Sequence, residues 1–228
     1  MNRIVAGALA LMLAAPSLTV AQAVDSSSAV RDSGGVRVAG WAGRLDPSEI
    51  KAGAKLSSTS LVTDGAGIRV ITGPGAIYWN EANKGAGTYT AKASFAQSNA
   101  LRADDYYGLF VGGSELGKPN QNYLYCAISS NGTFVVKHRL GDELHDLAGR
   151  TAHSAIRRAD GAGKAANEVA WKVASARTSC WVNGAEVWSY AGKDLVGVGK
   201  LESLDGIAGI RVGRILNLHI SGFGVAAR

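Results

Sequence analysis

Short alternations of apolar and polar residues, separated by turns that contain glycine, recur along the chain at a spacing of roughly ten residues. Alternation places successive side chains on opposite faces of a strand, and the 3.6-residue period of a helix is scarce here. Many short strands of this kind predict an all-β sandwich or barrel. The expected strands are Gly40–Leu45, Ser58–Thr63, Gly67–Thr72, Ala76–Asn80, Thr88–Phe95, Tyr106–Val111, Asn122–Ser129, Thr133–Leu140, Glu168–Ala174, Thr178–Val182, Glu186–Tyr190, Ile207–Val212 and Leu216–Val225.

The turns between these strands support the same order. Asn131-Gly132 and Asn183-Gly184 each join two alternating runs, and both supply the positive φ that a two-residue hairpin turn requires. The pattern weakens between Arg139 and Asn167, where we expect one small strand and a long surface loop. One helical turn is expected within Lys193–Leu201. Further reversals are marked by Asp64-Gly65, Asp160-Gly161 and Asp205-Gly206.

The first residues have the pattern of a secretory signal peptide. Arg3 precedes a continuous apolar run from Ile4 to Ala15, and Ala21-Gln22-Ala23 matches the small-x-small cleavage pattern. The run is shorter than the roughly 20 residues of a spanning helix, so no membrane span is expected in the mature chain. We therefore expect a signal peptide over 1–23, a flexible leader over 24–38 and one sandwich domain over 39–228, exported to the periplasm or beyond the cell.

The formal net charge is +6 at pH 7, but the Lys and Arg residues are scattered and never form a run of four. Scattered charge favours solubility over a polyanion-binding surface, so nucleic acid is not an expected partner. No feature of the sequence indicates an oligomeric state.

Two cysteines, Cys126 and Cys180, alternate into the predicted core. An oxidising compartment permits a disulfide between them. Two packed sheets start about 10 Å apart, which is too far for a disulfide unless the two strands are neighbours in one sheet. The sequence therefore allows two alternatives, a disulfide between these cysteines or two buried thiols.

Several segments carry a family likeness, and together they cover Trp41 to Val225. They resemble exported bacterial proteins with a laminin-G-like or concanavalin A-like jelly roll, near the domain called 3-keto-disaccharide hydrolase. The resemblance implies two packed antiparallel sheets, one of them concave. No catalytic residue is carried over, because no motif of this chain fixes one. The segments are Gly40–Asp46, Thr72–Trp79, Tyr107–Gly113, Tyr123–Tyr125, Asn131–Lys137 and Asn217–Phe223.

Alternation also predicts a face that is both aromatic and basic. Leu124, Cys126 and Ile128 should face the core, which leaves the residues between them on the opposite side. Tyr and Trp rings stack on the apolar face of a sugar, and Arg and Lys donate hydrogen bonds to its hydroxyls and carboxylates. The alternative is that these rings cover sheet surface beneath a loop, with basic stems packed beside them. The predicted glycan-binding residues are Tyr123, Tyr125, Lys137, Arg139, Lys172 and Trp181.

Catalytic and metal sites have weaker signals. Glycoside hydrolysis usually needs two carboxylates, but the adjacent acids Asp104-Asp105 and Asp142-Glu143 point to opposite faces if they lie on strands. The acids to mutate first are Glu81, Glu143 and Asp205. The histidines lack the spacing of a zinc site, so neither a metal nor another cofactor is expected, although a metal assembled across strands stays open. His138 alternates with core residues and should be a hydrogen-bonded residue at the core edge; the other histidines are His145, His153 and His219.

The favoured function is an exported, non-catalytic module that binds a polysaccharide or oligosaccharide through this face. One alternative is a glycan hydrolase or lyase that uses loop carboxylates. Another is a structural or protein-interaction module of the cell envelope. An enzyme should show convergent carboxylates in a cleft, a binding module should show exposed rings without them, and an assembly module should show a wide apolar patch.

Overall fold

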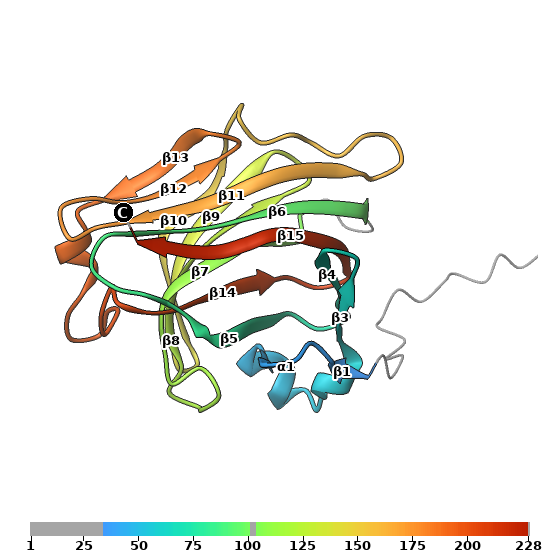
Figure 1. The fold of residues 1–228 in the computed structure, drawn as a ribbon, viewed down its shortest axis with the longest axis horizontal. Helices are drawn as coiled ribbons and strands as arrows, with labels where there is room; N and C mark the ends of the chain where they lie inside the picture. The colour runs from blue at the N-terminus through green and yellow to red at the C-terminus, as the bar shows by residue number, and fades with distance from the viewer. Residues whose placement is uncertain (1–33, 101–103, 228) are drawn as a thin grey trace, which may run out of the picture.

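The computed structural model describes residues 34–100 and 104–227, which fold as two packed sheets (Figure 1). The predicted signal peptide lies outside the described residues, as does most of the predicted leader. All strand pairs are antiparallel in the described residues except β1 with β3. One sheet has the order β1 (Gly35–Val36), β3 (Ser60–Asp64), β4 (Gly67–Ile71), β15 (Leu216–Ala227), β6 (Tyr89–Ala100), β11 (Ala165–Val173), β12 (Thr178–Val182) and β13 (Ala185–Tyr190), and we call it the larger sheet.

The smaller sheet packs against the larger one, and the two together form a jelly-roll-like sandwich, as the sequence predicts. Within the described residues its order is β10 (Glu143–Ala152), β9 (Thr133–Leu140), β8 (Asn122–Ser129), β7 (Tyr106–Ser114), β14 (Gly206–Val212), β5 (Ala76–Gly85) and β2 (Trp41–Leu45). The short helical elements are α1 (Pro47–Lys51), η1 (Leu56–Ser58) and η2 (Gly192–Leu195). No described helix has the length and apolar character needed to cross a membrane.

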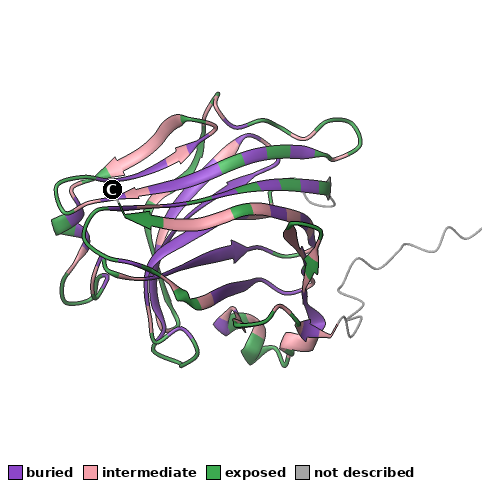
Figure 2. Cartoon of the chain, in the orientation of Figure 1, coloured by how far each residue is buried: buried purple, intermediate pink, exposed green. Residues whose placement is uncertain are grey.

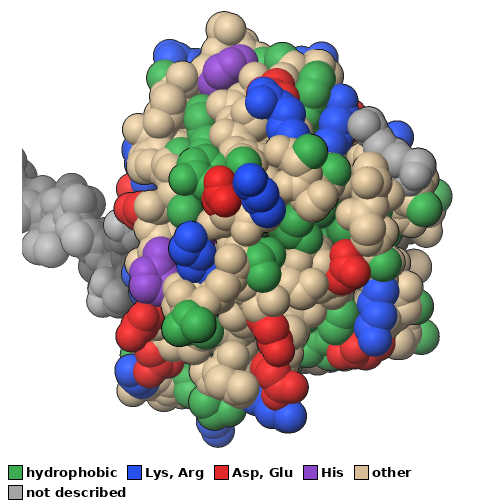
Figure 3. Space-filling view, turned by 90° about the vertical axis from the view of Figure 1, so that its left-hand side faces the viewer, with side chains coloured by type: hydrophobic (Ala, Val, Ile, Leu, Met, Phe, Trp, Pro, Cys, Tyr) green, Lys and Arg blue, Asp and Glu red, His purple; other side chains and the backbone are tan. Residues whose placement is uncertain are grey.

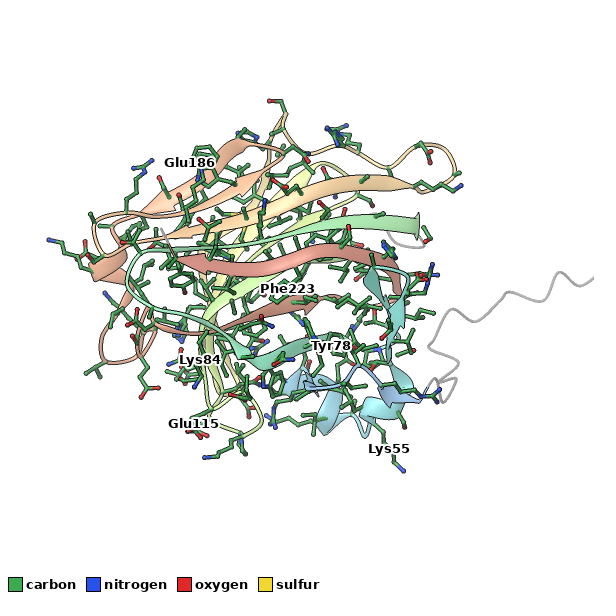
Figure 4. The ribbon with its side chains drawn as sticks, in the orientation of Figure 1. Lys55, Tyr78, Lys84, Glu115, Glu186 and Phe223 are labelled. Atoms are coloured by element: carbon green, nitrogen blue, oxygen red, sulfur yellow. A yellow bond between two sulfur atoms is a disulfide. The ribbon has the colours of Figure 1, made fainter. Side chains whose placement is uncertain are left out.

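Alternation builds the core between the sheets. Buried and exposed residues alternate along β6 and along the first part of β11 (Figure 2). Leu124, Cys126 and Ile128 are all buried in this core, so the face assigned to β8 from the sequence is confirmed. Phe134 of β9 and Val182 of β12 are buried in the same core. Figure 4 shows Tyr78 of β5 among the side chains between the sheets. Trp171 links the two layers, because its indole N–H donates to the carbonyl oxygen of Leu109 at 3.0 Å.

The two predicted hairpin turns differ in length. Asn183 and Gly184 have φ values of 50° and 84°, which is the geometry expected of a two-residue hairpin turn between β12 and β13. The turn between β8 and β9 spans Ser130 to Gly132, and in it only Gly132 has a positive φ, at 86°. A glycine in the left-handed region suits this three-residue turn as well.

Several elements differ from what the sequence predicts. β10 is a full strand of ten residues rather than one small strand, and nearly all of its residues are exposed. Because neither of its faces is buried, the strand has no apolar alternation to detect. β1 forms at Gly35–Val36, inside the segment expected to be a flexible leader, where it pairs with β3. α1 follows β2 and begins at Pro47, a residue well suited to a first helical turn.

Cys126 and Cys180 form a disulfide that joins β8 of the smaller sheet to β12 of the larger sheet. Their Cα atoms are 6.3 Å apart, which is within the range that a disulfide spans. The argument that opposing sheets are too far apart was therefore wrong here. A separation of about 10 Å is an average, and twisted sheets come closer at some points.

Candidate ligand-binding site

The outer face of the smaller sheet carries a second group of buried residues, on the side away from the main core. Tyr123 and Tyr125 lie there, opposite Leu124 and Cys126, as alternation predicts. They are only 1% and 0% exposed, so their rings are covered rather than open to a ligand. Alternation identifies the face of a residue, but it does not reveal what covers that face. The outer cluster consists of Ile77, Trp79, Phe110, Leu116, Tyr123, Tyr125, Ala127, Val135 and Ile207.

Close packing on this face depends on a glycine in β14. A Cβ atom at Gly209 would lie 2.5 Å from ring carbons of Phe110 and 2.4 Å from the carbonyl oxygen of Tyr78. Such distances do not occur in folded proteins, so the position requires glycine. Two residues later, Arg211 places its guanidinium carbon 5.6 Å from the ring centre of Tyr106 and 5.4 Å from that of Tyr125. These distances are typical of cation–π contacts.

Asp46 lies between two arginines that come from different strands. Arg211 Nη2 is 2.6 Å from Asp46 Oδ2, and its Nη1 donates to the carbonyl oxygens of Ala76 and Val212. Arg139 of β9 approaches the other carboxylate oxygen, with Nη2 3.8 Å from Asp46 Oδ1. The side chains of Arg211, Arg139 and Asp46 are 2%, 8% and 14% exposed. The outer face thus contains a nearly buried group of two guanidinium ions and one carboxylate, which we call the Arg–Asp–Arg group.

The environment of this group sets the ionisation of its neighbours. Burial raises the pKa of Tyr125 and of Tyr123, although the charge of Arg211 opposes the shift in both. Burial would also raise the pKa of Tyr106, but the charge of Arg211 and hydrogen bonds lower it below its usual value. Burial disfavours the charge of Arg211, yet Asp46 holds its pKa well above the usual range. The two buried tyrosines are therefore uncharged at neutral pH, and Arg211 stays charged.

A pocket of about 410 Å³ opens over the Arg–Asp–Arg group. Tyr106 provides an aromatic wall, Leu144 of β10 provides an apolar one, and Arg150 stands at the rim. Arg150 donates from both terminal nitrogens to the carbonyl oxygen of Asp104 at 3.3 Å. The pocket therefore combines fixed hydrogen-bond donors, a carboxylate and a ring in one concave site.

The six residues predicted to bind glycan lie on two different sheets. Tyr123, Tyr125, Lys137 and Arg139 belong to the outer face of the smaller sheet, and of these only Arg139 lines the pocket. Lys137 is paired with Asp146 at 2.9 Å. Lys172 and Trp181 belong instead to the outer face of the larger sheet, beside a shallow hollow of about 420 Å³.

On the larger sheet, Lys172 already occupies one face of the Trp181 ring. Its Nζ lies 3.1 Å from the ring centre, and the indole N–H of Trp181 donates to Ser179 Oγ at 2.8 Å. This is the arrangement of a basic stem packed beside a ring, the alternative that the sequence left open. A sugar could stack on that face only by displacing the ammonium group. We therefore take the pocket of the smaller sheet as the stronger candidate site.

Sequence reasoning missed most residues of the pocket, among them Asp46, Tyr106 and Arg211. A usable signal was present for Arg211, because it interrupts the apolar end of β14 between Ile210 and Val212. A charged residue in a strand that is otherwise apolar usually has a specific partner. Asp46 gave no such signal, since it lies in an ordinary connection after β2.

The acids chosen from the sequence have separate structural partners and do not line the pocket. Glu81 accepts a hydrogen bond from the indole N–H of Trp79 at 3.0 Å, and Asp205 accepts one from the backbone N–H of Gly87 at 2.7 Å. Glu143 pairs with His145 at 3.2 Å on the exposed strand β10. The adjacent acids Asp104 and Asp105 do line the pocket, where Asp104 is an exposed turn residue and Asp105 is half-buried.

His138 occupies the position that its alternation predicts. It is 5% exposed, and its Nε2 lies 2.8 Å from Asn122 Oδ1. Burial, and then the charge of His145, lower the pKa of His138 to about 4. In the described part of the chain, no cluster of three or more His, Cys, Asp or Glu residues could hold a metal ion.

No family model matches this sequence, and no curated protein is significantly similar to it. Solved structures do match. The carbohydrate-binding module CBM66 from Bacillus subtilis superposes with a TM-score of 0.57 at 9% identity, over 84% of this chain and 98% of that one. A protein of unknown function with a galectin-like fold from Bacillus subtilis gives 0.57 at 12% identity, over 82% and 90% of the two chains. The chain has the fold of these proteins.

A third match is a mutant of the GH43 protein BlXynB from Bacillus licheniformis, with a TM-score of 0.50 at 13% identity. It covers 83% of this chain but only 37% of BlXynB. At such identities these matches show the jelly-roll-like sandwich and nothing finer. The nearer resemblance to the 3-keto-disaccharide hydrolase domain is supported by no family match and stays a prediction.

Proposed function

We propose that the protein is an exported, non-catalytic module that binds a saccharide in the pocket on the outer face of the smaller sheet. The observation that carries the proposal is the Arg–Asp–Arg group at the floor of this pocket, next to the ring of Tyr106. Each sugar hydroxyl both donates and accepts hydrogen bonds, so neighbouring hydroxyls pair well with a carboxylate and a guanidinium held side by side. The apolar face of the sugar ring can then stack on Tyr106.

Three further observations support the proposal. The pocket, at about 410 Å³, has the size of typical small-molecule sites. CBM66, one of the proteins with the same fold, is described as a carbohydrate-binding module. The Cys126–Cys180 disulfide agrees with the signal-peptide pattern of the sequence, because disulfides persist in oxidising compartments.

On the face drawn in Figure 3, basic and acidic side chains are interspersed, so this face does not suggest a polyanion partner. Figure 4 shows Glu186 on β13, the edge strand of the larger sheet, where it pairs with Arg177. A compact site for a small sugar unit therefore fits this surface better than a wide electrostatic one.

The test is binding of the mature protein to a panel of oligosaccharides and polysaccharides, measured by calorimetry. Tyr106→Ala should weaken binding at least about tenfold, because the stacking surface is lost. Trp181→Ala, on the opposite sheet, is the matched control and should bind like the unmodified protein. Thermal unfolding of both variants checks that each is folded. The proposal is refuted if no saccharide of the panel binds. It is also refuted if Trp181→Ala loses binding while Tyr106→Ala keeps it.

A further inference from the structure

The Arg–Asp–Arg group holds two positive charges and one negative charge almost out of contact with water. A buried charge is costly unless an opposite charge compensates it. Two of the tyrosines beside the group, Tyr123 and Tyr125, do not supply that charge, because burial keeps them uncharged. Burial would also raise the pKa of the third, Tyr106, but Arg211 and hydrogen bonds lower it below its usual value. Among Arg139, Arg211 and Asp46, positive charge is therefore in excess by one.

Both arginines also have a donor nitrogen that makes no hydrogen bond in the described part of the chain. Among the described residues, the buried Nε atoms of Arg139 and Arg211 have no hydrogen-bond partner. The 3.8 Å contact between Arg139 and Asp46 is too long for a hydrogen bond. Arg139 donates from Nη1 to the carbonyl oxygen of Asp142 at 3.2 Å and also interacts with the hydroxyl of Tyr123. Buried donors without a partner are rare in folded proteins, and both arginines that carry them line the pocket. An acceptor supplied by a ligand would bind the guanidinium groups of these arginines.

Acidic residues also line the pocket, but they lie elsewhere in it. Glu49 is paired with Arg214, so its charge is already compensated. Asp104 is exposed and Asp105 is half-buried, so water and salt screen their charges more than those of the nearly buried Arg–Asp–Arg group. Arg139 and Arg211, by contrast, are fixed at the floor, where interactions between charges are stronger. An anionic group is therefore favoured at the floor rather than at the rim.

The geometry points to a sugar that carries a carboxylate, a uronic acid residue, as the ligand of this pocket. Its carboxylate would face Arg139 and Arg211 at the floor, and its ring would lie against Tyr106. One carboxylate supplies the single negative charge that the Arg–Asp–Arg group lacks, and its two oxygens match the fork of a guanidinium. This inference rests on the proposed saccharide-binding function and narrows it to one class of sugar.

The test compares matched ligands. Short oligomers of galacturonic, glucuronic and mannuronic acid are each paired with the neutral oligomer made by reducing their carboxyl groups to alcohols. Calorimetry at constant ionic strength should show at least one uronic acid oligomer binding about tenfold or more tightly than its neutral counterpart. Arg139→Met should remove that preference, and Lys92→Met, beside the hollow of the larger sheet, should preserve it. If Arg139→Met does not fold, Arg150→Met at the exposed rim serves as the second variant and should reduce the preference.

The outcomes separate this inference from the proposal on which it rests. Equal binding within every pair, or tighter binding of the neutral member, overturns the carboxylate inference and leaves saccharide binding intact. Preferential binding of a sulfated oligosaccharide over every uronic acid oligomer also overturns it. If neither member of any pair binds, and no saccharide of the wider panel binds either, both the carboxylate inference and the proposed saccharide binding are refuted.

Discussion

Arg211 and Asp46 form a nearly buried ion pair, 2.6 Å long, between residues that are 165 positions apart in the sequence. The pair ties β14 to the connection between β2 and α1. Arg211 also donates to the carbonyl oxygens of Ala76 and Val212, so its guanidinium is fixed from several sides. One carboxylate thereby holds together the floor of the candidate pocket.

Asp46→Asn should lower the free energy of unfolding by about 3 kcal/mol, because it leaves two arginines without a carboxylate. Urea unfolding followed by tryptophan fluorescence measures the change. Asp142→Asn is the control: it removes the exposed pair with Lys51 and should have no measurable effect. Adding Arg211→Met to Asp46→Asn should restore part of the loss, since the uncompensated charge is then removed. A double variant less stable than Asp46→Asn alone would contradict this account.

Replacing both Cys126 and Cys180 with alanine should cost about 4 kcal/mol of unfolding free energy, by the chain-entropy estimate for a separation of 54 residues. The folded structure should persist, since both residues lie in a core held by many other contacts. Comparison of the double variant with the unmodified protein, each with and without reductant, checks this value. Reductant should destabilise only the unmodified protein. Equal stability of the oxidised protein and the double variant would show that the bond contributes nothing.

Protonation of His138 should destabilise the protein in mild acid. The folded-state pKa is about 4, below the value of about 6.5 in an unfolded chain, so the unfolded state binds the proton more tightly. Stability is therefore complete above about pH 6.5 and falls as the pH drops toward 4, by on the order of 1–3 kcal/mol. His138→Gln should flatten this part of the stability profile. His153→Gln, in the connection after β10, should keep the original slope, and an equal flattening in both variants would refute the assignment to His138.

The sandwich could be predicted because each of its core strands carries its own signal. Leu124, Phe134 and Val182 each alternate with residues that face the other way, and one buried face is enough to identify a strand. β10 shows the limit of this reasoning. Neither face of this strand is buried, so its extended structure depends on its hydrogen bonds to β9.

The candidate site was harder to predict, because it depends on contacts between distant parts of the chain. Alternation identified Arg139 and the face to which it belongs. It could not indicate that Arg139 reaches toward Asp46, which enters from the connection after β2. Nor could it separate Lys172 and Trp181 from the first face, since the assignment of strands to two sheets is a property of the whole topology.

The cross-link between β8 and β12 has a consequence for biogenesis. Because its two sulfurs come from opposing layers, the bond joins one half of the molecule to the other rather than the two arms of a local hairpin. If it forms before the sheets pack, it already holds the two halves near each other. A chain in which the bond has not yet formed lacks this link between the layers, so proteases should act on it more readily than on the oxidised protein.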